Sequence, residues 1–202
     1  MDNFGLYVIA TKPALSYGAV AEICVQQGVR FLQLREKELS DKQLLRAASE
    51  IRSVTRGSDT LFVMNDRADL AYLAGADCLH LGQDDIAVDD ARQIVGEMPI
   101  ALSTHSLAQV EAANQEKLLY IGFGPIYPTT TKANPDPTVG TQLLAEAVKL
   151  SHVPVVAIGG IFPENIESVI EAGAKNICMV RHLMGEDMEQ RIIETNRLLN
   201  RI

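Results

Sequence analysis

The segment Tyr120-Ile-Gly-Phe-Gly-Pro-Ile-Tyr-Pro-Thr-Thr-Thr-Lys132 begins as a short apolar run, stops at Gly and Pro, and then presents three hydroxyls and an ammonium group. Pro125 and Pro128 can continue neither a strand nor a helix, so they predict a loop of fixed direction after a strand. The threonines offer hydroxyl and backbone donors and Lys132 a point charge, as an anion site requires. Solvated turns use the same residues, so this segment alone leaves both interpretations open.

Similar apolar runs recur along the whole chain, separated by segments with helical spacing. The eight expected strands are residues 6–10, 31–35, 61–65, 78–81, 100–103, 120–123, 155–158 and 176–180, and the clearest helical segments are 41–55, 107–116, 142–150, 163–172 and about 188–199. Buried strands that alternate with helices argue for a parallel sheet, and eight such units are what a closed (β/α)8 TIM barrel requires. An open doubly wound sheet is the alternative, but no strand is followed by G-x-G-x-x-G or a Walker-type glycine motif.

The composition limits the class of protein. A chain of 202 residues with 47% hydrophobic content can bury one sizeable core, so we expect residues 1–202 to form a single domain. The 18 Lys and Arg against 26 Asp and Glu give a net charge of -8, the wrong sign for a broad nucleic-acid surface. Nucleic acid is therefore not an expected partner, whereas a small phosphorylated ligand in a locally basic cleft is.

The chain carries no signal for a membrane or for an oxidising compartment. Neither a basic, apolar leader nor a run of about 18 apolar residues occurs, so we expect a soluble, cytoplasmic protein with no membrane partner. The three cysteines, Cys24, Cys78 and Cys178, are odd in number, widely spaced and set among apolar neighbours. This pattern indicates reduced core thiols and argues against a disulfide framework or a zinc site.

Polar side chains collect where the expected strands end. In a parallel barrel all these positions face one mouth, which is where the fold builds its sites. The residues are Gln33, Arg35, Lys37, Asn65, Asp66, Gln83, Asp85, Ser103, His105, Thr129, Thr131 and Lys132.

Three groups of these residues suggest specific chemistry. Gln33, Arg35 and Lys37 alternate with period two and would share one side of an extended segment, although surface pairing with nearby acids is the alternative. Asp66 and Asp85 follow adjacent strands, and two carboxylates held together need a cation such as Mg2+; helix capping, by Asp66 or Asp69, is the alternative. Gly160 ends a strand where the backbone can approach a phosphate, although a tight turn would use it too.

Taken together, these motifs make the chain resemble the thiamine-phosphate synthase family along almost its whole length. The matching segments, in order, are Gln33-Leu-Arg-Glu-Lys37, Asn65-Asp66-Arg67, His80-Leu-Gly-Gln-Asp-Asp85, Ser103-x-His105, the stretch from Gly122 to Lys132, and Ala157-Ile-Gly-Gly-Ile161. The resemblance implies a single (β/α)8 barrel that joins 4-amino-2-methyl-5-hydroxymethylpyrimidine diphosphate to a thiazole phosphate, giving thiamine phosphate and pyrophosphate. Barrels of this family often form dimers, so a homodimer is the assembly that the resemblance suggests.

The resemblance also implies roles for individual residues. Asp66 and Asp85 would bind Mg2+, and Arg35, Lys37, Ser103 and Lys132 would act in catalysis. The pyrimidine diphosphate would contact Gln33, Leu34, Arg35, Glu36, Lys37, Asn65, Ser103 and Lys132. The thiazole phosphate would contact Thr129, Thr130, Thr131, Gly160, Val180 and Arg181.

The chain departs from the family pattern after its last strand. The family usually reads Val-Ser-Ala-Ile there, whereas this chain reads Met179-Val180-Arg181-His182-Leu183. Arg181 could pair with the phosphate or block it, and we expect pairing. The first strand is also unusual, with Ile9-Ala-Thr11 where Ile-Thr-Asp is common.

Two other functions stay open at this point. A thiazole tautomerase shares the barrel but needs a His on the loop after the sixth strand, where this chain has Gly124-Pro125-Ile126, and His105 is not an obvious substitute. The altered segment at Arg181 also leaves room for a barrel that binds ligands or regulates without turnover. A phosphate-binding barrel of tryptophan or histidine synthesis has no support beyond the shared fold.

Overall fold

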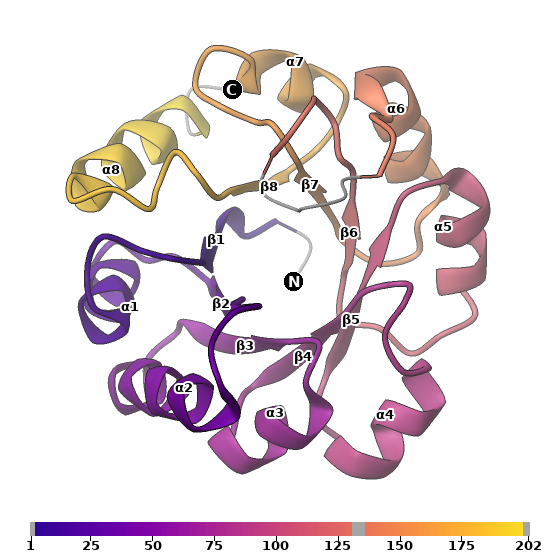
Figure 1. The fold of residues 1–202 in the computed structure, drawn as a ribbon. Coiled ribbons are helices and arrows are strands. Elements are labelled where there is room, and N and C mark those ends of the chain that lie inside the picture. The colour runs from indigo at the N-terminus through magenta and orange to yellow at the C-terminus, as the bar shows by residue number, and fades with distance from the viewer. Residues whose placement is uncertain (1–2, 131–135, 200–202) are drawn as a thin grey trace.

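The structure is a computed structural model that describes residues 3–130 and 136–199. Eight parallel strands close into a barrel in chain order, and the helices form a ring around it (Figure 1). The elements are β1 Gly5–Ala10, α1 Tyr17–Gln26, β2 Phe31–Leu34, α2 Asp41–Thr55, β3 Leu61–Asn65, α3 Ala68–Ala74, β4 Cys78–Leu81, α4 Val88–Val95, β5 Ile100–Thr104, α5 Leu107–Ala113, β6 Ile121–Phe123, α6 Gly140–Leu150, β7 Val155–Ile158, α7 Ile166–Glu171, β8 Asn176–Met179 and α8 Met188–Leu199. The predicted single-domain (β/α)8 barrel is confirmed.

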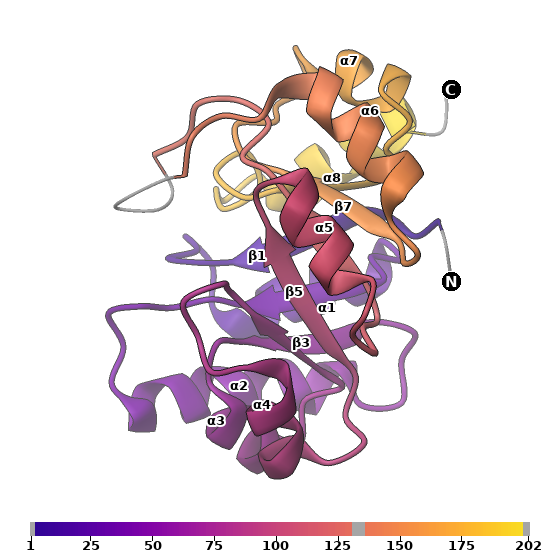
Figure 2. The same ribbon diagram turned by 90° about the vertical axis from the view of Figure 1, so that its right-hand side faces the viewer.

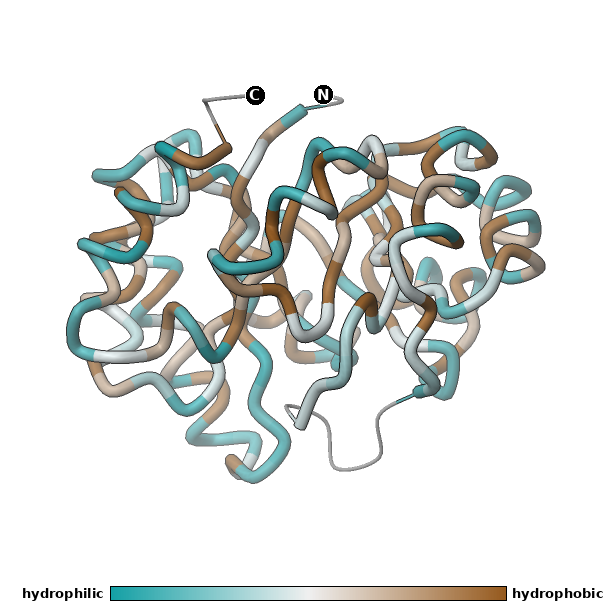
Figure 3. The backbone as a smooth tube through the Cα atoms, turned by 90° about the horizontal axis from the view of Figure 1, so that it is seen from above, coloured by the Kyte–Doolittle hydropathy of each residue, from teal (hydrophilic) through white to brown (hydrophobic). Residues whose placement is uncertain are grey.

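The strands are apolar on both faces because each face has its own core. Leu32, Leu34 and Phe62 point outward and are fully buried against the helices. Their neighbours Phe31 and Val63 point inward and pack with residues of the other strands in the barrel interior. Figure 3, which views the barrel from the side, shows hydrophobic segments mainly in the middle of the molecule and hydrophilic segments mainly at its edges. Near-continuous apolar strands are therefore required by burial on two sides.

The three thiols belong to these cores. Cys24, Cys78 and Cys178 are all buried and free, as the sequence predicted. Burial raises the pKa of each thiol, so all three stay protonated at neutral pH. No helix in the described part of the chain is long and apolar enough to cross a membrane.

The loops that leave the carboxyl ends of the strands lie at one end of the barrel. In Figure 2 the loops after β2 and β6 both extend to the left, beyond the ends of their strands. The loop after β6 continues beside β7, because Ile126 N–H donates to Ile158 O at 2.9 Å and Tyr127 N–H donates to Gly159 O at 2.9 Å. The segment after β6 is therefore held against the end of β7.

Glycines make this close approach between β6 and β7 possible. A Cβ at Gly124 would overlap the backbone oxygen of Ile158, and one at Gly159 would lie 2.5 Å from Pro125 Cβ. Gly159 and Gly160 also have φ values of 100° and 65°, which side chains other than glycine rarely adopt. The backbone at the end of β7 is thus bare because a side chain has no room there.

We predict that Gly124→Ala lowers the free energy of unfolding by about 2 kcal/mol or more, because the new methyl group meets backbone that cannot move aside. Gly18→Ala is the matched control, since its Cβ would touch only Glu50 Cβ at 4.0 Å inside α1. That control should keep or slightly raise stability, because Ala favours helix over Gly. Urea denaturation measures both variants, and equal stabilities would contradict the steric account.

Candidate active site

Two carboxylates from neighbouring strands meet at the mouth of the barrel. Asp66 follows β3 in a left-handed backbone conformation with φ of 62°, and its N–H donates to His80 O of β4 at 2.8 Å. Asp85 follows β4 and accepts a hydrogen bond from Gly82 N–H at 2.6 Å. The two carboxyl groups are close enough for Asp66 to act on the pKa of Asp85. The structure therefore brings together the two residues that the sequence predicted as a metal-binding pair.

The charges around this pair are partly compensated. Partial burial raises the pKa of Asp85, and Asp66 raises it further, while Gly82 N–H and the Lys37 ammonium act in the opposite direction. Lys37 also forms an ion pair with Asp66. Two adjacent carboxylates favour the binding of either a proton or a cation between them, and Lys37 is the cation that the structure places there.

The alternative role of these aspartates as helix caps is wrong. The N-cap of α3 is Arg67, and no side chain caps this helix. Asp69 instead binds Arg67 Nη2 at 2.7 Å, and Asp41 binds Arg67 Nη1 at 2.6 Å. These contacts with Arg67 lower the pKa of both carboxyl groups. Asp66 is left to face Lys37 and Asp85.

The acidic pair fits a divalent cation that keeps part of its shell for other ligands. Within residues 3–130 and 136–199, no group of three or more His, Cys, Asp or Glu side chains could hold a metal. Asp66 and Asp85 would therefore supply only two protein ligands, leaving positions for water and for substrate oxygens. A closed structural metal site does not fit this donor set.

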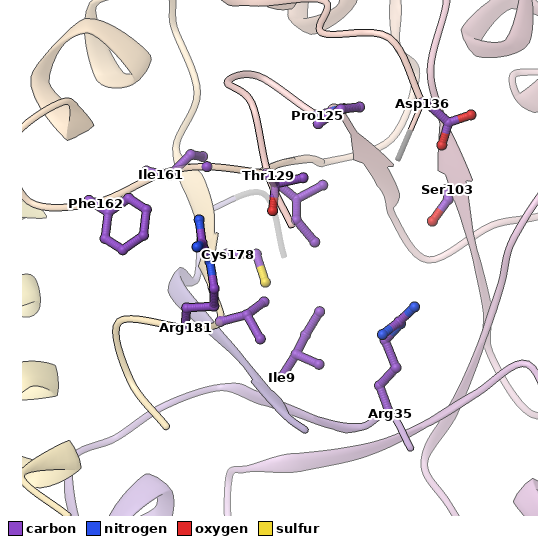
Figure 4. Close-up of a pocket in the computed structure, with 14 residues that line it drawn as sticks. Ile9, Arg35, Ser103, Pro125, Thr129, Asp136, Ile161, Phe162, Cys178 and Arg181 are labelled. Atoms are coloured by element: carbon purple, nitrogen blue, oxygen red, sulfur yellow. The ribbon is translucent and has the colours of Figure 1, made fainter. Parts of the chain in front are cut away.

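A pocket adjoins the mouth and brings together residues from both predicted substrate sites. Arg35 and Ser103, predicted for the pyrimidine diphosphate, line it with Thr129, Gly160, Val180 and Arg181, predicted for the thiazole phosphate. Its other walls include Ile9, Ile158, Phe162 and Cys178, which are apolar. Figure 4 shows Arg35 and Arg181 extending into the pocket from different sides, with Ser103 and Asp136 facing them across it.

Arg181 is held by two contacts. Its guanidinium carbon lies 5.2 Å from the centre of the Phe162 ring, and its Nη1 donates to Thr130 Oγ1 at 3.2 Å. These contacts hold a positive charge in the wall of the pocket that Gly160 also lines. The bulky residue that departs from the family pattern thus adds a cation to the predicted phosphate site.

The remaining predicted residues lie in different surroundings. Gln33 is buried in the barrel interior, where its Nε2 donates to Tyr7 Oη at 3.0 Å. Leu34 packs outward against the helices, so only its backbone can face the mouth. Glu36 accepts hydrogen bonds from Lys12 N–H at 2.5 Å and Tyr17 Oη at 2.7 Å, away from the acidic pair.

Three predicted site residues remain, and the structure describes only Asn65 among them. Asn65 ends β3, half-buried, with its backbone in register with His80 of β4. Thr131 and Lys132 lie outside the described residues.

Two polar residues that the sequence reasoning did not assign stand beside the site. His80 is buried, and its Nε2 lies 2.9 Å from Ser103 Oγ. The period-two alternation of β4 could have placed it inward with Cys78, on the same face of the strand. Asp136 lines the pocket, and its Oδ2 lies 3.4 Å from His105 Nε2. Nothing in the local sequence marks Asp136 as a pocket residue.

Comparison with known proteins identifies the family. The family described as thiamine monophosphate synthase matches residues 6–183. The thiamine-phosphate synthase of Pelotomaculum thermopropionicum is 41% identical over 179 residues, which cover 88% of this chain and 82% of that protein. The corresponding protein of Caldicellulosiruptor bescii is 37% identical over 177 residues, covering 87% and 81%.

A solved structure agrees with the sequence matches. Thiamine phosphate pyrophosphorylase from Pyrococcus furiosus superposes with a TM-score of 0.87 at 28% identity, covering 99% of this chain and 97% of that one. The family match takes in the acidic pair and the pocket residues from Arg35 to Arg181. The chain therefore belongs to the thiamine monophosphate synthase family.

Proposed function

We propose that this protein is a thiamine-phosphate synthase, which transfers the aminopyrimidinylmethyl group from its diphosphate to a thiazole phosphate. The observation that carries the proposal is that the end of the barrel with the Asp66, Asp85 and Lys37 group also has the pocket that contains Arg35 and Arg181. The Asp66, Asp85 and Lys37 group suits a metal-bound diphosphate, and the pocket suits a second anionic substrate. Family membership supports the same reaction.

The chemistry needs charge stabilisation and alignment, with no protein nucleophile. The bond between the methylene carbon and the diphosphate oxygen breaks, its electron pair leaves with pyrophosphate, and the thiazole nitrogen then forms the new bond to that carbon. Lys37 and Arg35 neutralise the charge that develops on the leaving group. The pocket holds the second substrate in line with the carbon, which removes much of the entropic cost of the encounter.

The cation in this proposal is Mg2+, held by Asp66 and Asp85. It prefers oxygen ligands, keeps several waters, and would neutralise the diphosphate and orient it. Lys132 is proposed to complete the cationic environment, and Thr129 to Thr131 with the Gly160 backbone to receive the thiazole phosphate. Gln33 and Asn65 are proposed to hold the pyrimidine end.

The tautomerase alternative gains no support from the site. His105 does approach the loop after β6, with its Nδ1 2.6 Å from Gly124 O, but it is not among the residues that line the pocket. Its Nε2 faces Asp136 at 3.4 Å. His105 is thus engaged in holding the loop, and a general acid or base must reach the substrate.

A pyrophosphate-release assay tests the proposed function. Release should require both substrates and Mg2+, and thiamine phosphate should form in equal amount. Isomerisation of the thiazole without pyrophosphate would identify a tautomerase, and binding without turnover would identify a ligand-binding barrel. Either result would overturn the proposal.

We predict that Lys37→Ala slows bond formation about a hundredfold or more, because it removes a fixed positive charge from the leaving group. Single-turnover quench experiments with saturating substrates measure this step directly. Lys42→Ala is the control, since Lys42 is exposed on α2 and has no ion pair among the described residues. Near-normal single-turnover rates in Lys37→Ala would remove Lys37 from the catalytic role.

We predict that Asp85→Asn stabilises the metal-free protein at neutral pH. The raised pKa means that folding opposes ionisation of Asp85, so wild-type stability falls as pH rises from its ordinary pKa through the folded one. Asn carries no charge, can still accept from Gly82 N–H, and can donate to Asp66. Thermal melts in a chelator should therefore show a higher Tm than wild type at pH 7 and no gain at low pH.

The same variant should also lose the response to metal. Mg2+ at a hundred times its Kd should stabilise the wild type by about 2.7 kcal/mol and leave Asp85→Asn nearly unchanged. Equal metal-induced shifts in the two proteins would place the cation elsewhere.

We predict that Arg181→Ser raises the KM for the thiazole phosphate about tenfold, as expected for the loss of one charge-assisted contact. The KM for the pyrimidine diphosphate should change little. Arg46→Ser is the matched control, because Arg46 lies exposed on α2 and pairs only with Glu50 among the described residues. Steady-state kinetics in which each substrate is varied in turn measure both KM values. A large fall in the KM for the thiazole phosphate would show that Arg181 obstructs the site.

A further inference from the structure

A continuous chain of hydrogen-bonding groups crosses the barrel interior and ends in the pocket. Gln33 Nε2 donates to Tyr7 Oη at 3.0 Å, and Tyr7 Oη lies 2.6 Å from Tyr120 Oη. Tyr120 Oη lies 3.2 Å from His80 Nδ1, and His80 Nε2 lies 2.9 Å from Ser103 Oγ. The hydrogen-bonded series ends at Gln33 on one side and at Ser103 on the other, and both residues are proposed to bind the pyrimidine diphosphate.

We assign the direction of each hydrogen bond in this series by starting from the Gln33 amide. The Gln33 amide nitrogen can only donate, so Tyr7 Oη accepts there. Tyr120 Oη is the other partner of the Tyr7 hydroxyl among the described residues, so the arrangement that leaves no buried hydroxyl hydrogen unpaired has Tyr7 donating to Tyr120. Tyr120 in turn gives its hydrogen to His80 Nδ1. An acceptor Nδ1 means that the neutral imidazole carries its hydrogen on Nε2, which then donates to Ser103 Oγ.

Burial and ring packing around the two tyrosines and His80 keep these donor and acceptor roles fixed. Burial raises the pKa of Tyr7 and of Tyr120 well above the ordinary value, so both phenols retain the hydrogen on which these roles depend. The Tyr120 and His80 rings are stacked with centroids 5.7 Å apart, and Tyr7 stacks on Phe31 at 5.6 Å. Packed rings have little freedom to turn away from their partners.

We infer that His80 is a positioning residue for the proposed transfer reaction, which donates to Ser103 and thereby turns the Ser103 hydroxyl hydrogen toward the pocket. Ser103 lines the pocket beside Arg35, and His80 is the one partner of its hydroxyl within the described residues. Having accepted from His80, this hydroxyl is left as a donor for an acceptor atom of the pyrimidine diphosphate. The inference rests on the proposed function for the identity of that ligand.

The opposite polarity would have a different chemical result. If His80 carried its hydrogen on Nδ1, it would donate to Tyr120, and the Ser103 hydroxyl would donate to His80 Nε2. Ser103 could then only accept, and it would face the diphosphate with a lone pair. The tautomer of His80 therefore decides whether Ser103 attracts or repels an acceptor atom.

Nitrogen NMR of the protein labelled with 15N-histidine tests this tautomer without any turnover. The chain has four His residues, and the His80 signals are those missing from His80→Asn. We expect a protonated Nε2 and a bare Nδ1 at neutral pH, and a shift away from this single tautomer in Tyr120→Phe. A hydrogen on Nδ1 in the wild type would overturn the inference and would leave the proposed function intact.

A double-mutant cycle then tests the link to Ser103. His80→Asn should lower kcat/KM for the pyrimidine diphosphate about ten- to hundredfold, the loss expected when a hydrogen bond to a charged ligand is weakened. In a Ser103→Ala background the same change should cost less than about threefold, because the positioned hydroxyl is already absent. Losses that multiply in full would show that His80 acts independently of Ser103.

Two further variants guard against a folding artefact. Tyr120→Phe keeps the ring and removes the hydroxyl that donates to His80. It should lower kcat/KM for the pyrimidine diphosphate in the wild-type background and have a smaller effect in the Ser103→Ala background, as predicted for His80→Asn. It replaces His80→Asn in the cycle if that variant does not fold. His152→Asn is the matched control, since His152 is exposed between α6 and β7, and should keep wild-type activity. A wild-type protein that releases no pyrophosphate would refute the proposed function alone, because the tautomer is read from the free protein.

Discussion

Closure of the parallel sheet is the constraint on which the rest of this structure depends. Because all eight strands run the same way, every strand delivers its last residues to the same end of the barrel. Asp66 and Asp85 are 19 positions apart in the sequence but follow neighbouring strands, and the register Asn65 to His80 brings them into contact. The same closure brings Arg35 and Arg181, from loops near opposite ends of the chain, into one pocket.

The polar interior of the barrel shows how a site can be supported from below. Two buried phenols would be costly without partners, and Tyr7 and Tyr120 partner each other across the barrel interior, with Gln33 and His80 as their further partners. The result is a hydrogen-bonded layer in the barrel interior that ends at Ser103, a residue of the pocket wall. The hydrogen bonds that satisfy the buried phenols thus also reach the pocket wall, so one network serves both the core and the surface of the pocket.

The sequence predicted the architecture well because burial on two faces imposes a strong pattern. The runs at residues 61–65, 78–81 and 155–158 coincide with β3, β4 and β7. The acidic pair could also be placed, since strand order determines which loops are neighbours. Asp136 could not, because its place in the pocket depends on the path of a long loop. The network of Tyr7, Tyr120 and His80 was missed because inward residues on non-adjacent strands are related only through the closed barrel.

The contacts of Glu36 have a consequence for the two cations on either side of it. Its carboxylate is anchored by Tyr17 of α1 and by the backbone of Lys12, and it is not among the residues that line the pocket. Because Glu36 lies between Arg35 and Lys37 in the sequence, this anchor fixes the backbone from which both cations extend. A helix of the outer ring is thereby tied through Glu36 to the segment that carries Arg35 and Lys37, so a shift of α1 would displace both cations.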